Sequence, residues 1–71
     1  MNTKHTPEQA RSDLSSYARA MRIGNHTAAT RIEEAWDLFG CPPEIVSEIL
    51  ACVATGLPLD AAHREVMRSA S

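Results

Sequence analysis

Apolar residues recur along the chain at spacings of three and four, in four segments separated by glycines and prolines. This spacing places apolar side chains on one face of an α-helix, so it indicates helices rather than strands. Glycine favours the position after a helix C-terminus, and proline fits the first turn of a helix. Glycines stand at 24, 40 and 56, and prolines at 7, 42, 43 and 58. We therefore predict an all-α chain of four short helices, at about 7–22, 26–39, 43–55 and 58–69.

The first two segments each combine a helix-start signal with an apolar stripe. Thr6 and Gln9 match a capping box, and Asn25 or Thr27 caps the second helix. The predicted core stripes consist of Ala10, Leu14, Tyr17, Ala18 and Met21 in the first helix and Ala28, Ile32, Ala35, Trp36 and Phe39 in the second. We expect Trp36 and Phe39 to supply most of the buried core area, because aromatic side chains are large.

The third segment is apolar over an unusually wide arc, about 160° at roughly 100° per residue. Either this helix lies at the centre of the fold, or part of its surface meets another chain. We favour the second interpretation. It predicts a partner or dimer interface formed by Ile45, Ile49, Leu50 and Val53.

The fourth segment carries its stripe on Leu59, Ala62, Val66, Met67 and Ala70. The two halves of the chain show a weak internal repeat. A Pro-Glu pair at 7–8, Gly24 and an Ala-Ala pair at 28–29 are answered by Pro-Glu at 43–44, Gly56 and Ala-Ala at 61–62. We therefore predict that the helices pack as two hairpins in a small bundle, with residues 1–5 and 69–71 frayed.

Seventy-one residues make one small domain, which spans 1–71. Only three residues are aromatic, while eleven are alanine, so the core is thin. Chains of this size are close to the limit at which a single core suffices, and association of identical chains is a common remedy. We expect a homodimer.

Charge is unevenly distributed around a net value of −2. Residues 1–31 carry a net charge of +3 and residues 32–71 a net charge of −5. Helical spacing places Arg11, Arg19 and Arg22 along one exposed strip of the first helix. We interpret this strip as a charged surface that faces a partner and sets its orientation.

The location of the protein is predicted from what the sequence lacks. No apolar stretch reaches the roughly 20 residues that span a membrane, and the first nine residues, MNTKHTPEQ, have no apolar segment typical of a signal peptide. Two cysteines, Cys41 and Cys52, are too few for a disulfide scaffold. We expect a soluble cytoplasmic protein with reduced thiols and no contact with membranes.

Residues able to perform chemistry are present but badly spaced for it. The candidate metal ligands His26, Cys41, Cys52 and His63 include no close pair of the kind that zinc sites use. Glu33 and Glu34 are adjacent, so they diverge around a helix and cannot face each other as acid and base. We predict no enzyme activity, no cofactor or metal, and no small-molecule substrate.

Two function classes remain. The favoured one is a non-catalytic helical module that binds another protein, as an adaptor, inhibitor or regulator, and self-associates. The alternative is a DNA-binding regulator that uses the basic first helix or a degenerate helix-turn-helix centred on Gly40. That motif presents Glu44 and Glu48 to the DNA, and carboxylates repel phosphates, so nucleic acid is the less favoured partner.

Overall fold

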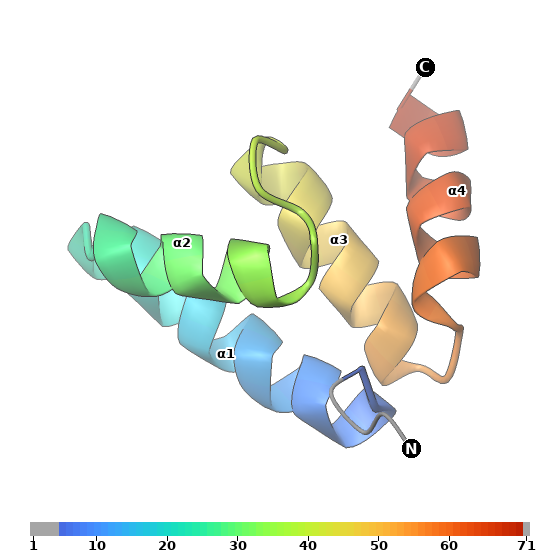
Figure 1. The fold of residues 1–71 in the computed structure, drawn as a ribbon, viewed down its shortest axis with the longest axis horizontal. Coiled ribbons are helices and arrows are strands. Elements are labelled where there is room, and N and C mark those ends of the chain that lie inside the picture. The colour runs from blue at the N-terminus through green and yellow to red at the C-terminus, as the bar shows by residue number, and fades with distance from the viewer. Residues whose placement is uncertain (1–4, 71) are drawn as a thin grey trace.

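The computed structural model describes residues 5–70, which form four α-helices (Figure 1). Their bounds are Pro7–Ile23 for α1, His26–Ala35 for α2, Pro43–Ala54 for α3 and Leu59–Ala70 for α4. The all-α prediction is confirmed. Figure 1 shows α1 and α2 running in opposite directions as one hairpin, and α3 and α4 as a second. Of the predicted frayed residues, 1–4 and 71 lie outside the described part of the chain.

The hairpins meet through α3, which packs against both α1 and α4, while α1 also packs against α2. The molecule measures 33 × 29 × 17 Å along its principal axes. It is therefore flat, and its shortest dimension is less than two helix diameters of roughly 10–12 Å.

The N-termini of α1 and α2 are capped by residues that the sequence predicts as N-caps. Thr6 Oγ1 accepts a hydrogen bond from the Gln9 backbone N–H at 3.0 Å, and Asn25 Oδ1 accepts one from the Ala28 N–H at 3.2 Å. The Gln9 side chain does not complete the predicted capping box. Its Nε2 donates instead to Asp13 Oδ1, one turn along the helix, at 2.9 Å.

Glycine ends α1 and α3 as the sequence predicts. Gly24 has φ 77° and Gly56 has φ 115°, a left-handed region that glycine enters without a steric penalty. The N–H of the residue after each glycine then reaches back to the helix, from Asn25 to the Ala20 carbonyl and from Leu57 to the Cys52 carbonyl. This is the Schellman motif, which satisfies carbonyls at the helix end.

The end of α2 differs from the prediction by four residues, because Asp37 rather than Gly40 terminates the helix. Asp37 has φ 57°, and its N–H donates to the Glu34 carbonyl at 3.2 Å. The Leu38 N–H donates to the Glu33 carbonyl at 2.7 Å, which completes the same motif with aspartate in place of glycine.

Because α2 ends early, the apolar side chain that is buried after Trp36 is Leu38 rather than Phe39. Leu38 is turned into the core and is 1% exposed, whereas Phe39 leaves the helix and is 68% exposed. The prediction that Phe39 belongs to the core is therefore wrong, and Leu38 takes its place.

The wide apolar arc of α3 is covered from within the chain. Val46, Ile49, Leu50 and Val53 are all buried, and α1 and α4 supply the covering helices. Ala10 and Ala20 of α1 and Ala62 of α4 are buried in the same cluster. Alanines at these contacts let the helices approach closely, which is how a chain with so few large side chains fills its core.

The two largest buried side chains, Trp36 and Tyr17, join α1 to the α2 segment. Trp36 Nε1 donates to Asp13 Oδ2 at 2.8 Å, and the Tyr17 hydroxyl donates to Glu33 Oε2 at 2.6 Å. The His5 ring lies against the Trp36 ring with centroids 4.6 Å apart. The predicted core position of Trp36 is confirmed, and its polar edge is satisfied.

Candidate functional site

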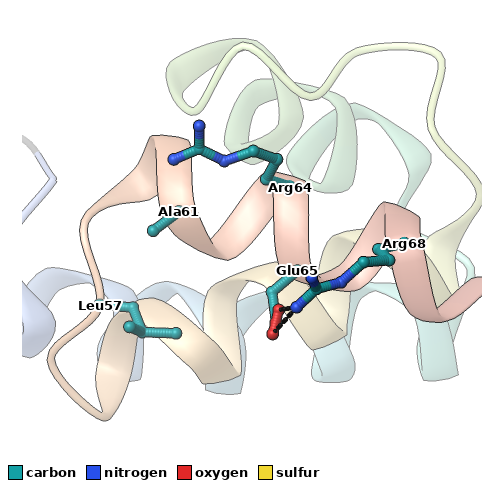
Figure 2. Close-up of a pocket in the computed structure, with 5 residues that line it drawn as sticks. All are labelled: Leu57, Ala61, Arg64, Glu65 and Arg68. Carbon is teal, nitrogen blue, oxygen red and sulfur yellow. Dashed lines mark hydrogen bonds and ion pairs between the residues drawn. The ribbon is translucent and has the colours of Figure 1, made fainter.

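A pocket of about 370 Å³ lies on the outer side of α4. Figure 2 shows its lining, in which Leu57 comes from the α3–α4 loop and the other side chains come from α4. Its apolar part consists of Leu57 and Ala61, and its charged rim of Arg64, Glu65 and Arg68.

Helical spacing explains why these side chains share one surface. Leu57 lies just before α4 and is 39% exposed because the Schellman turn after α3 carries the chain away from the core. Ala61, Arg64, Glu65 and Arg68 then follow at intervals that stay on one side of a helix. The other side of α4 presents Ala62 and Val66 to the core. Thus α4 buries one face and exposes a second, partly apolar one.

The charge of the pocket is positive, although the chain as a whole is acidic. Arg68 forms an ion pair with Glu65 one turn earlier, and the dashed lines in Figure 2 mark it. Arg64 has no hydrogen bond or ion pair within residues 5–70, and Figure 2 shows its guanidinium directed away from that pair. One arginine of the rim is therefore available to an anionic group.

A second hollow of about 470 Å³ lies between α4 and the segment after α2. Asp37, Asp60, His63 and Arg64 contribute to its walls, so its lining is mixed in charge and more polar than that of the first pocket. It has no exposed large apolar side chain, because Trp36 and Leu38 are buried. The pocket over Leu57 and Ala61 is therefore the better candidate for a binding surface.

The predicted interface residues of α3 are buried or half-buried, whereas an interface with another chain requires exposed side chains. Ile49 and Leu50 are fully buried, Val53 is 1% exposed, and Ile45 is half-buried. These side chains pack within a single chain, which accounts for the apolar arc without a partner. Their role in an interface stays a prediction. It has no support from exposure, because Ile49, Leu50 and Val53 present no exposed surface.

The predicted charged strip of α1 is exposed at all three positions. Arg11 also has a structural contact, because its Nη2 donates to the Ala54 carbonyl at the end of α3 at 3.4 Å. A cation at a helix C-terminus is favourable to the helix dipole. Arg11 therefore helps to hold α1 against α3, while Arg19 and Arg22 face outward.

Sequence reasoning missed the pocket residues. It placed Ala62, Val66 and Met67 on the core face of the last helix and counted Arg64 and Arg68 only in the charge balance. The signal was the spacing of Leu57, Ala61 and Arg64, which continues one stripe on the polar side. Met67, predicted as core, is 44% exposed, so the apolar face of α4 is narrower than expected.

Tyr17 is the one described residue with a large pKa shift. Burial raises the pKa of its hydroxyl well above the ordinary value of 10.0, because the phenolate would lose solvation, and the hydrogen bond to Glu33 and its negative charge raise it further. Deprotonating Tyr17 therefore costs more free energy in the folded protein than in the unfolded chain.

We expect the free energy of unfolding to fall as the pH rises above about 10. A raised pKa in the folded state gives stability that is complete below the unfolded pKa and is lost above it. Denaturant unfolding between about pH 9 and pH 11 measures this slope. Tyr17→Phe removes the titrating group, so its slope should be flatter. An equal slope in both proteins would contradict the assignment to Tyr17.

The described residues contain no cluster of three or more His, Cys, Asp or Glu side chains placed to hold a metal ion. Nor does any helix of residues 5–70 combine the length and apolar character needed to cross a bilayer. Comparisons of the chain with protein-family models, with curated proteins and with solved structures give no match. The site must therefore be interpreted from its own chemistry.

Proposed function

We propose that this chain is a small non-catalytic helical module that binds another protein through the outer face of α4. The pocket formed by Leu57 and Ala61 beneath an arginine rim is the observation that carries the proposal. Protein interfaces commonly combine an apolar centre, into which a partner side chain inserts, with a polar rim.

The rim defines the partner's chemistry. Arginine binds carboxylates through two parallel hydrogen bonds, and Arg64 is without a partner among the described residues. The complementary segment is an apolar side chain flanked by acidic residues. Binding of this kind, without catalysis, is the mode of action of an adaptor, inhibitor or regulator.

DNA binding is less well supported. The exposed residues in the first half of α3 are Pro43, Glu44 and Glu48, so the helix of the degenerate helix-turn-helix presents acids. On α1, Arg11 is engaged with the Ala54 carbonyl. Two outward arginines, Arg19 and Arg22, remain for phosphate contacts, and few phosphate contacts give weak binding.

The proposal is tested by changing the centre of the pocket. Ala61→Glu fills the apolar part and adds a negative charge beneath the arginines, so it should weaken partner binding at least about tenfold. Glutamate is a good helix former, and Ala61 is only half-buried, so α4 should remain folded. Helical circular dichroism of the same sample checks this.

His63→Glu is the matched control, because it places the same charge about 200° around the helix on an exposed position. Each protein is used to capture partners from the native host, which are identified by mass spectrometry and then purified. Calorimetric titration against the purified partner gives the affinities. We expect wild type and His63→Glu to bind alike. If Ala61→Glu binds as tightly as they do, the pocket is not the binding site.

A further inference from the structure

We infer that one occupant of the α4 pocket is a second copy of this chain, which inserts Phe39 between Leu57 and the arginine rim. The inference rests on the proposed function, because it assigns an occupant to the same pocket.

Phe39 has the properties of an anchor side chain. At 68% exposure it is the most exposed of the large apolar residues in the described chain, and the Schellman turn at Asp37 holds it outside the helix. Leu38 on one side is buried, and Cys41 on the other is half-buried and hydrogen-bonded through its N–H to the Leu38 carbonyl at 3.1 Å. The loop is thus anchored on both sides of an aromatic ring that points away from the core.

The charge around Phe39 is opposite to that of the pocket rim. Residues 33–48 contain no lysine, arginine or histidine, and their five acids are Glu33, Glu34, Asp37, Glu44 and Glu48. All of these except Glu33 are exposed. Asp37 and Glu44 lie on either side of Phe39 in the chain and can face Arg64 and Arg68 of a second copy. Opposite potentials across an interface favour that orientation over the alternatives.

The size of the pocket also fits. A cavity of roughly 150 Å³ is enough to hold a benzene ring, and the pocket measures about 370 Å³. It therefore has room for the phenyl ring of Phe39 and for the ends of the arginine side chains that would close over it.

The contact joins two different surfaces, since each copy has one Phe39 loop and one α4 pocket. If two copies make this contact reciprocally, they close into a two-fold symmetric dimer; if they do not, the contact is heterologous and continues to a third copy. In both cases a copy that lacks the loop anchor and a copy that lacks the pocket have one compatible pair of surfaces between them. This property allows a direct test.

The experiment uses Phe39→Ser to remove the anchor and Ala61→Glu to block the pocket in the full chain. Sedimentation velocity over a concentration series measures association of wild type and of each variant. We expect wild type to associate and each variant alone to associate at least about 30-fold more weakly, the effect of losing a central interface residue. An equimolar mixture of the two variants should form a one-to-one dimer, because one intact contact is restored.

Ile23→Ser is the matched control, since Ile23 is 64% exposed at the C-terminal end of α1 and does not line the α4 pocket, and it should associate as wild type does. Circular dichroism confirms that each variant is folded. A wild-type chain that stays monomeric, a Phe39→Ser variant that associates normally, or a mixture that fails to form the dimer would each overturn the inference. None of these results contradicts the proposed function, which fails only if Ala61→Glu retains the host partner.

Discussion

Trp36→Ala should lose most of its helical circular dichroism. Emptying a buried site of this size costs about 3–5 kcal/mol. A chain of 71 residues has a free energy of unfolding of about 4–11 kcal/mol in total, at roughly 0.05–0.15 kcal/mol per residue. Trp36 is 1% exposed and is the largest fully buried side chain, so its loss removes a large share of that stability.

A second variant separates the ring from its polar edge. Trp36→Phe keeps an aromatic ring but removes the N–H that donates to Asp13 Oδ2 at 2.8 Å. Asp13 retains its bond from Gln9 on the other oxygen, so the cost should be nearer 1–3 kcal/mol, and the protein should fold with a lower melting temperature. If Trp36→Ala melts like wild type, the ring does not hold α1 and the α2 segment together.

Ile49→Asp should unfold the chain rather than merely prevent it from associating. Ile49 is fully buried in α3, where the helix is covered by α1 and α4, and an unpaired carboxylate there has no water and no cation to stabilise it. Ile49→Val removes one methylene from the same site and should cost only about 0.5–1.5 kcal/mol. Circular dichroism and sedimentation of both variants decide the outcome.

This experiment also tests the interface that the sequence predicts on α3. A folded Ile49→Asp protein that has lost self-association would show that α3 meets another chain after all. An unfolded protein, with Ile49→Val close to wild type, assigns the residue to the core.

The helix count, the hairpin arrangement and most of the helix ends follow from apolar spacing and from Gly24, Gly56 and the prolines, because these are local signals. The end of α2 could not be predicted in the same way. Asp37 and Gly40 can each close a helix, and glycine is the commoner choice. What decides between them is whether Leu38 or Phe39 fills the space beside Trp36, which depends on the packing of distant segments.

The packing partners of α3 could not be predicted from the sequence for a related reason. A wide apolar arc shows that a helix is covered on two sides, but it does not show what covers it. Alanine-rich faces on α1 and α4 have weak hydrophobic signals, although their small side chains are what allows both helices to reach α3. The pocket was missed because exposure of Leu57 and Ala61 depends on where the turn at Gly56 directs α4.

The small accessible surface of the molecule has a thermodynamic consequence for binding of the proposed partner. Its accessible surface is 4769 Å², and an interface of ordinary size covers about 800 Å² on each side, which is roughly one-sixth of the total. A partner present at 100 times its dissociation constant adds about 2.7 kcal/mol to the free energy of unfolding. That amount is a quarter or more of the free energy of unfolding of the chain alone. We therefore expect the free protein to be sensitive to proteolysis and the bound protein to be long-lived. The cellular abundance of this chain should then follow that of the proposed partner.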